Sequence, residues 1–351
     1  MIHSNPDLIA SYLMDKKYES RGADLLAGWD FTDSWATNNA TIDNATTFTA
    51  DANNGYIRRT YLTAGKQYKL KIAGTISTGI LEIYSGLTGT VDRFYISATS
   101  PFNTVLSFTA NGTQLAFLAA TSGAVVNITS MQLYPVTIMD LSGNGHDASI
   151  FPGAGGFTTG PDGRVNSAYD FDGLLTKMET ALVSNARFQN GFTIEAVINP
   201  ASEGEGIEGN TGRIIDKTDL SAGTINGFAF STVSSGRLQM RIGNALSNSS
   251  NDAYTAGVYV HVLALVAADG TTSYFINNTL FGTPGDAGNL ADITTSNPLT
   301  IGNRSTATDR AFDGPIALVN VYDAVYGQDW VSHRYKKFQQ SLQRGHFKGL
   351  L

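Results

Sequence analysis

Paired carboxylates are the side chains that this sequence would need in order to cleave a glycosidic bond. Two acids on alternate residues of one strand lie on the same face, at the separation that such cleavage requires. Asp170 and Asp172 have this spacing, but they flank Phe171 directly before an Asp-Gly turn, so an edge or turn pair is the simpler interpretation. Glu195 is alone within the apolar run 192–198. We expect no catalytic residues and predict that the protein is not an enzyme.

Metal chemistry receives little support from the histidines. The sequence has five, none with the spacing of metal ligands, and it has no cysteine, which excludes disulfides and thiolate metal sites. His261 lies in the strand-like run 258–262. We expect it to be a packed strand residue rather than a ligand.

Aromatic rings offer a second kind of chemistry. A flat ring can stack on the C–H face of a sugar while amides and carboxylates bind its hydroxyls. Trp29, Trp35 and Tyr56 are the candidates for glycan binding in the first part of the chain. For Trp29 and Trp35 the alternative is a place in the core, and both interpretations stay open. No glycan-binding residue can be named in the second part.

The elements that would position these residues are strands. Glycine is abundant at 37 residues, proline is scarce at 9, and charged residues make up only 15% of the 351, a composition typical of β-sandwiches with short turns. Runs such as 67–73 and 191–200 alternate apolar with polar residues and end at turns or proline. The expected fold class is all-β, with two tandem antiparallel β-sandwiches and short N- and C-terminal helices.

The second half opens on a run suited to tight turns, DLSGNGHDAS from Asp140 to Ser149. Its glycines favour positive φ, and Asp140 and Asn144 can hydrogen-bond their own backbone and pin the turn. The blocks AYDFDG, FTIEAVINP, GRIIDKTD, GFAFST, GRLQMRIG, VYVHVLALVAADG, SYFINN, LTIGNRS and FDGPIALVNVYDAV follow it. In this order they resemble the laminin-G-like, concanavalin A-like jelly rolls over about residues 139–330. The resemblance implies a lectin-like jelly roll.

The same resemblance implies a structural calcium near this turn. Asp140 and Asn144 match the family motif, and Ca²⁺ prefers the oxygen ligands that such a turn supplies. Family members commonly place an acid after the late Phe-x-Gly-x-Ile, where this chain has Ala317 and Leu318; Asp313 lies nearby but not at the matching position. The alternative is that Asp140 and Asn144 only hold the turn. Ca²⁺ is the one cofactor expected.

The first half resembles jelly-roll carbohydrate-binding modules more loosely. The resemblance is carried by LTAGKQYKL at 62–70 and VNITSMQLYP at 126–135. We therefore predict four parts: an N-terminal helical arm at 1–21, a carbohydrate-binding-module-like sandwich at 22–138, a laminin-G-like jelly roll at 139–330 and a basic C-terminal helix or tail at 331–351.

The terminal segments carry two open interpretations each. Leu8, Ile9, Tyr12 and Leu13 fall on one face of a helix, which docks on its own domain or reaches a neighbouring subunit. Trp330, Tyr335, Phe338 and Leu342 follow near-helical spacing between Gly327 and Gly345. That second helix either closes its own sandwich with a solvated basic face or docks on an acidic partner.

These features together give the functional hypotheses. The net charge of −7 offers no general attraction for nucleic acid, and neither a signal peptide nor a membrane-spanning run is visible. Our main hypothesis is a non-enzymatic phage or viral virion protein (a capsid decoration, head fibre or tail appendage), made in the host cytoplasm. It would be held through its terminal helices by other virion proteins as a homo-oligomer and would contact cell-surface glycans. The alternative is a glycan-binding adhesion protein of the bacterial extracellular surface. A glycoside hydrolase or polysaccharide lyase is the third hypothesis.

Overall fold

The computed structural model describes residues 7–14, 16–86, 92–97, 100–151, 153, 155–202, 211–221, 224–304 and 310–344. Within these ranges the strand pairs are antiparallel apart from one isolated bridge, and a single α-helix is present, so the all-β prediction is confirmed. The chain divides into two compact units. Unit 1 comprises Met1–Glu19 and Ile138–Leu351, and unit 2 comprises Ser20–Thr137.

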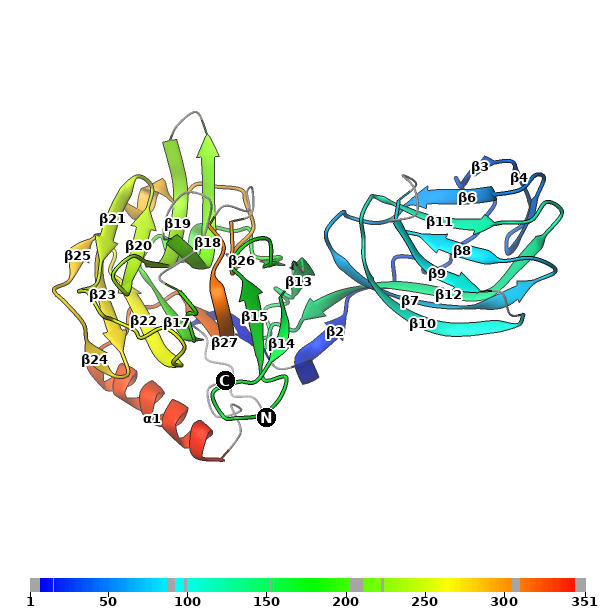
Figure 1. Cartoon of the computed structure of the whole chain (residues 1–351). Coiled ribbons are helices and arrows are strands. Elements are labelled where there is room, and N and C mark those ends of the chain that lie inside the picture. The colour runs from blue at the N-terminus through cyan, green and yellow to red at the C-terminus, as the bar shows by residue number, and fades with distance from the viewer. Residues whose placement is uncertain are drawn as a thin grey trace. The chain divides into compact units, whose positions relative to one another are not determined.

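Unit 2 is a sandwich of two sheets (Figure 1). One sheet has β10 (Phe102–Thr109), β7 (Gln67–Ile76) and β12 (Val125–Ile138), with β2 (Glu19–Arg21), β5 (Thr47–Ala50) and β4 (Ala40–Asn44) on the other side of β12. The other sheet runs β3 (Ala36–Asn38), β6 (Gly55–Thr60), β11 (Gln114–Ala119), β8 (Leu81–Tyr84) and β9 (Arg93–Ser97). Alternation explains the layers. In β7, Tyr68, Leu70 and Ile72 are buried, while Lys69 and Lys71 point to the outer face.

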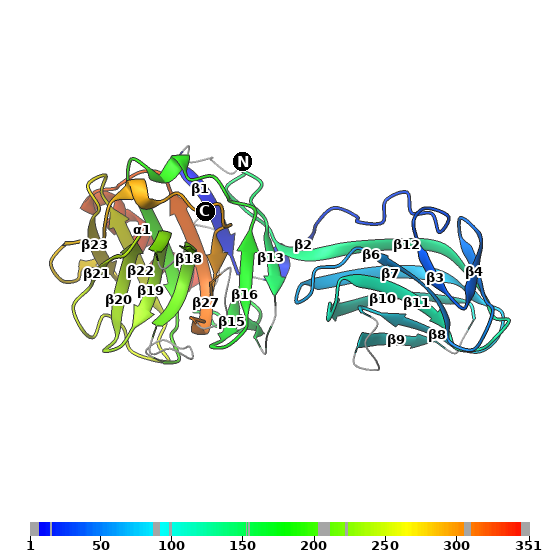
Figure 2. The same cartoon turned by 90° about the horizontal axis from the view of Figure 1, so that it is seen from above.

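Unit 1 is also built from two sheets (Figures 1 and 2). Sheet A runs β14 (Gly156–Thr158), β15 (Ala168–Asp172), β27 (Asp313–Tyr322), β17 (Phe192–Ile198), β22 (Val260–Val266), β23 (Thr271–Ile276) and β24 (Thr279–Leu280), with β25 (Gly285–Asp286) on β23. Within unit 1, sheet B runs β13 (Ala148–Phe151), β16 (Lys177–Thr180), β26 (Thr300–Ile301), β18 (Thr211–Ser221), β19 (Thr224–Val233), β20 (Arg237–Ile242) and β21 (Ala245–Asn248). Residues such as Ile194, Phe230 and Met240 are fully buried and fill the core.

The predicted N-terminal helix is wrong, because Leu8–Leu13 form the strand β1. β1 pairs with the half of β27 from Leu318 to Tyr322, next to the half that β15 covers (Figure 2). All six residues of β1 are buried, so polar Ser11 is as enclosed as its apolar neighbours. An open edge of β27 would leave unpaired N–H and C=O groups, and filling that edge outweighs the local helical pattern. The N-terminal segment therefore belongs to unit 1.

The predicted C-terminal helix is confirmed as α1 (Gln328–Arg344), which begins directly after Gly327. Its buried residues are Val331, Arg334, Phe338 and Ser341, and its apolar side chains join clusters on the outer face of sheet A. The interpretation as a helix that closes its own sandwich is thus correct, although Arg334 is buried rather than solvated. No helix in the described part of the chain is long and apolar enough to cross a membrane.

Candidate functional site

A cavity of about 450 Å³ opens on unit 2 beside Trp29, one of the three aromatic residues predicted to bind glycans. It is lined by Asp24, Leu26, Ala27, Gly28, Trp29, Lys71, Thr129, Ser130, Met131 and Gln132. The side chains of these lining residues include an indole, an amine, a carboxylate, an amide and two hydroxyls. Sequence reasoning found only the indole.

Strand register brings the polar part of this lining together. Gln132 of β12 lies directly opposite Lys71 of β7, and both alternate with buried neighbours, so they share the outer face of the sheet. The pairing of β12 slips between Ile128 and Ser130, which places Thr129 in a β-bulge. A bulge re-aims the side chains around it, so this irregularity shapes the wall of the cavity.

The loop before β3 supplies the rest of the wall. Asp24 anchors it, because its Oδ1 accepts hydrogen bonds from the backbone N–H of Leu26 and Leu133, both at 3.0 Å. The N–H of Leu25 donates to the carbonyl of Leu133 at 2.8 Å and ties the loop to β12. Trp29 is half-buried, and its ring lies 5.0 Å from that of Phe31 in the core. One part of the indole is therefore fixed by packing while another part faces the cavity.

The other two predicted aromatic residues do not reach this cavity. Trp35 is 7% exposed and packs in the core, with its ring 5.2 Å from Phe31 and 5.7 Å from Phe117. Trp35 could bind a glycan or lie in the core, and the structure places it in the core. Tyr56 is partly exposed on β6 of the other sheet, where Asn38 donates a hydrogen bond to its hydroxyl at 3.1 Å. The structure thus separates the three candidates and leaves Trp29 beside the hollow.

The turn at Asp140 is a hydrogen-bonded anchor. Its Oδ1 accepts from the N–H of Ser11 and of Ser142, both at 3.0 Å, and its Oδ2 accepts from the Ser142 hydroxyl at 2.8 Å and the His146 N–H at 3.0 Å. Asn144 donates from Nδ2 to two carbonyls of β1. A cation would have to displace donors from both carboxylate oxygens, so this donor set does not fit calcium. Asp140 and Asn144 hold the turn and β1.

Asp313 lies apart from that turn. It is paired with Asp172 at the start of β27, whereas Ser11, which contacts Asp140, pairs with Asn320 seven residues further on, roughly 23 Å at the rise of a strand. Among the described residues, no group of three or more His, Asp or Glu side chains could hold a metal ion. The three predicted calcium ligands are therefore not brought together.

Asp170 and Asp172, the alternating acids considered above as a hydrolase pair, lie beside a turn. Three consecutive N–H groups, of Leu174, Leu175 and Thr176, donate to Oδ1 of Asp172 at 2.9 to 3.0 Å. Burial, followed by the negative charges of Asp313 and Asp172, raises the pKa of Asp170. This geometry agrees with the interpretation as a turn pair.

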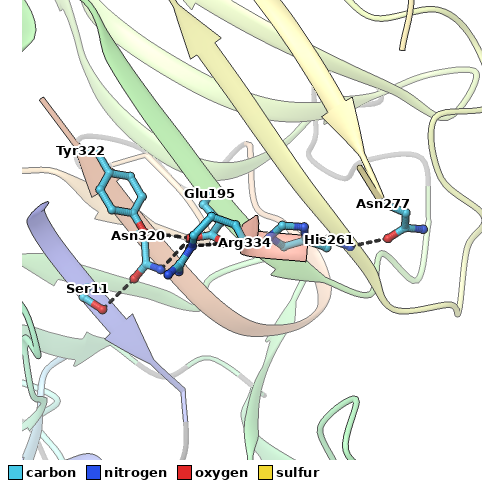
Figure 3. A network of polar contacts seen from close by, with 7 residues as sticks. All are labelled: Ser11, Glu195, His261, Asn277, Asn320, Tyr322 and Arg334. Atoms are coloured by element: carbon cyan, nitrogen blue, oxygen red, sulfur yellow. Dashed lines mark hydrogen bonds and ion pairs between the residues drawn. The ribbon is translucent and has the colours of Figure 1, made fainter. Parts of the chain in front are cut away.

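Glu195 is the centre of a buried polar network in unit 1 that the sequence did not predict (Figure 3). Arg334 of α1 donates to it, with Nη2 2.6 Å from Oε2. His261 Nε2 lies 2.8 Å from Oε1, and Asn320 Nδ2 and the Tyr322 hydroxyl donate to Oε2 at 2.8 and 2.9 Å. Register explains the convergence, because Glu195 of β17 lies directly opposite Asn320 of β27.

The electrostatics of this network favour a permanently charged pair. Burial alone would raise the pKa of Glu195, but the charge of Arg334 and the hydrogen bonds from His261 and Arg334 hold it well below its usual range. Burial would likewise lower the pKa of Arg334, and Glu195 raises it instead. With no exposed surface on Glu195, the network fastens α1 to sheet A and offers nothing to a substrate. The one feature of the sequence that indicates this network is Glu195 itself, a single acid within the apolar run 192–198. His261 is fully buried in the middle of β22, which confirms it as a packed strand residue.

One comparison with known families matches a part of unit 1. Residues 176–332 match the model of the concanavalin A-like lectin/glucanases superfamily. The binding domain of botulinum neurotoxin DC in complex with rat synaptotagmin II is similar at 15% identity, over 59% of this chain and 49% of that one, with a TM-score of 0.45. The Trypanosoma rangeli sialidase is similar at 15% identity, over 59% and 31%, with a TM-score of 0.43.

A third structure, the Ruminococcus gnavus IT-sialidase CBM40 bound to alpha2,3 sialyllactose, is similar at 17% identity, over 42% of this chain and 83% of that one, with a TM-score of 0.34. This chain spans less than two thirds of the length of the sialidase and of the neurotoxin domain. No curated protein sequence matches it. Residues 176–332 thus match the model of a concanavalin A-like superfamily and lie in an antiparallel two-sheet unit of an all-β chain.

Proposed function

We propose that this protein binds glycans for attachment and catalyses no reaction, with the cavity beside Trp29 as its saccharide site. The observation that carries this proposal is the lining of the cavity, where an indole meets Lys71, Gln132, Asp24 and two hydroxyls. Sugar sites combine an apolar ring for the C–H face with a few placed polar groups for the hydroxyls. The lectin family of residues 176–332 supports the same class of ligand.

Two acids of unit 1, Glu195 and Asp172, support a role without bond cleavage. Cleavage needs one carboxyl group that holds a proton and a second that acts from a set distance. Glu195 is buried and fastened by Arg334, and Oδ1 of Asp172 accepts three backbone hydrogen bonds. Neither carboxylate is available as a general acid.

A glycan array followed by titration of the best ligand tests the proposal. Lys71→Ala should weaken that ligand severalfold, because the ammonium lines the cavity. Lys69→Ala is the matched control, since Lys69 lies two residues away on the same face of β7 but outside the cavity. Equal effects of the two substitutions, or no glycan bound at millimolar concentration, would contradict the proposal.

The location of the protein stays a prediction: it lies on the surface of a virion or on the surface of a bacterium. Terminal helices were one motive for the virion hypothesis, beside the absence of a visible signal peptide and of catalytic motifs and the tandem modules. The N-terminal segment is instead a strand of sheet A, and α1 packs its apolar face on the same sheet. We therefore propose the surface of a bacterium first. Mass spectrometry of purified phage particles and of washed bacterial envelopes tests both.

A further inference from the structure

One edge strand of unit 2, β10, lacks the features that keep a β-strand from pairing with another chain. Within the described residues β10 pairs with β7 alone and ends its sheet (Figure 1). Edge strands are commonly protected by short length, charged side chains, proline or a β-bulge. The eight residues of β10 include no charged residue and no proline, and their register with β7 has no slip.

The other edge strands of unit 2 carry such protection. β3 has only three residues. β4 contains Asp43, and its pairing with β5 slips between Ile42 and Asn44. β9 contains Arg93, and its pairing with β8 slips as well. Among the described strands of this unit, β10 is thus the edge that is long, regular and uncharged.

The alternation of backbone groups shows which residues of β10 face the open edge. The N–H of Ala110, directly after β10, donates to the carbonyl of Lys66, directly before β7, at 2.9 Å. Ala110 therefore faces β7, and along an antiparallel strand every second residue does the same. Asn103, Val105 and Ser107 consequently direct their N–H and C=O groups away from β7. No hydrogen bond of the described residues takes up these groups.

The side chains of the same three residues are exposed on the outer face of the sheet, Val105 at 56%. The inner face is closed, because Phe102 and Phe108 are buried and the ring of Phe108 stacks on that of Phe94 of β9 at 3.8 Å. β9 thus covers the inner side of β10, but no pairing of the two strands is present in the described part of the chain. A strand added at the open edge would bury the exposed Val105.

We propose that β10 pairs antiparallel with β10 of a second copy of this chain, around a twofold axis at Val105. Such an axis places Val105 opposite Val105 of the second copy and Asn103 opposite Ser107. Apolar then meets apolar and amide meets hydroxyl. Each of these pairs is of the kind that exchanges two backbone hydrogen bonds, so about six join the copies. An axis at Asn103 would instead place Val105 opposite Pro101, which has no N–H.

The neighbouring charges permit this pairing. Lys71 of β7 lies opposite Val105. The two Lys71 residues of the dimer would therefore be three strand spacings apart, about 14 Å, which exceeds the screening length of about 8 Å at physiological salt. Lys71 also lines the Trp29 cavity, so the dimer would carry two such cavities on one continuous sheet face. This last consequence rests on the proposed function and would raise the affinity for a multivalent glycan.

Sedimentation equilibrium of the full chain without glycan tests the pairing. Between about 1 and 200 µM the mass should rise from 37.4 kDa toward twice that value. Val105→Lys should weaken the dimer about tenfold or more, because like charges would lie directly opposite each other. Val125→Lys is the matched control, since Val125 is exposed on the same sheet but its strand β12 is paired on both sides; it should leave the dissociation constant unchanged.

Ser107→Pro is a second variant that acts on the backbone of the edge. It removes an N–H that makes no hydrogen bond with the described residues of the monomer, and proline is tolerated at such edge positions. The fold should therefore persist, while the dimer loses about two hydrogen bonds and weakens severalfold.

A disulfide tests the register. The natural chain has no cysteine, so Val105→Cys introduces one thiol per copy. Opposed residues of a hydrogen-bonded antiparallel pair have Cα atoms about 5.5 Å apart, which a disulfide can span. Val105→Cys should form a covalent dimer under mild oxidation, and Val125→Cys should stay monomeric on a non-reducing gel.

The outcomes are independent of the Trp29 cavity, because no glycan is present, and Trp29→Ala should dimerise as the natural chain does. Dimerisation through β10 together with a failure to bind glycans would support this pairing and exclude only the cavity. A chain that stays monomeric at about 200 µM would leave the edge to a different partner and overturn the proposal. A dimer indifferent to both Val105→Lys and Ser107→Pro, or equal cross-linking of Val105→Cys and Val125→Cys, would overturn it as well.

Discussion

Glu195 shows at the scale of one residue how a buried charge can fasten an element. Its carboxylate receives hydrogen bonds from Arg334, Asn320 and Tyr322, and His261 Nε2 lies within hydrogen-bonding distance of it, so every partner is drawn from another part of the chain. Burying such a pair carries a large desolvation cost, which dense hydrogen bonding offsets. The Glu195–Arg334 pair instead fixes where α1 lies on sheet A, because Arg334 is the residue of α1 that reaches Glu195.

Replacing Arg334 with Met should destabilise unit 1 by about 3–5 kcal/mol, because Glu195 would remain buried without its counter-charge. Trp330 is the only tryptophan of unit 1, so its fluorescence in a Trp29→Phe, Trp35→Phe background reports urea unfolding of that unit. Lys336→Met, an exposed substitution on the same helix, is the control. Equal unfolding free energies for the two variants would argue against the network.

The Glu195 carboxylate should also make the unfolding free energy of unit 1 fall at acidic pH. The pKa of Glu195 in the folded state lies below its unfolded value of about 4.3. The stabilisation is therefore fully present above about pH 5 and is lost as the pH falls toward the folded-state pKa. Glu195→Gln should flatten the fall of the unfolding free energy of unit 1 between about pH 5 and pH 2. Parallel pH curves for the two proteins would contradict this.

Lys217 should make the unfolding free energy of unit 1 depend on pH in the alkaline range. It is fully buried, its Nζ donates to the carbonyls of Val183 and Asn297, and burial lowers its pKa to about 8. The unfolded chain then binds more protons between pH 8 and about 10.4, so the unfolding free energy contributed by this group rises with pH across that window. Lys217→Met should abolish the rise. Persistence of an equal rise in the variant would exclude Lys217 as its source.

At the scale of elements, β1 and α1 complete sheet A from the two ends of the chain. β1 fills the edge of β27, and α1 covers the outer face, which is why both faces of β17 are buried. The two terminal elements thus act on the same sheet although more than 300 residues separate them. Their sequences show only local amphipathic patterns, and a local pattern does not reveal a vacant edge.

Asp140→Ala tests the anchor of β1. It removes four hydrogen bonds, including that from the N–H of Ser11, and should lower the unfolding free energy of unit 1 by about 2–4 kcal/mol.

Since the donor set does not fit calcium, adding millimolar Ca²⁺ or a chelator to the natural protein should leave its unfolding midpoint unchanged. A midpoint that rises with Ca²⁺ and no longer does so in Asp140→Ala would restore the calcium hypothesis.

At the scale of the whole molecule, period-two alternation and turn residues were enough to predict an all-β chain. Runs such as 67–73 and 191–200 carried that prediction, and the strands β7 and β17 confirm it. The helix α1 was also predicted, because its spacing and flanking Gly327 are local. The Trp29 cavity was only partly predictable. Lys71 and Gln132 meet through cross-strand register, and Asp24 through a loop anchored on β12.

The central claim is that the cavity beside Trp29 binds a saccharide, and titration calorimetry with the strongest ligand from the array tests it most directly. Trp29→Ala removes the ring that lines the cavity and should lower the affinity about tenfold. Tyr56→Ala, on the other sheet, should leave the affinity as it is. Full affinity in Trp29→Ala, with the fold intact by circular dichroism, would contradict the account.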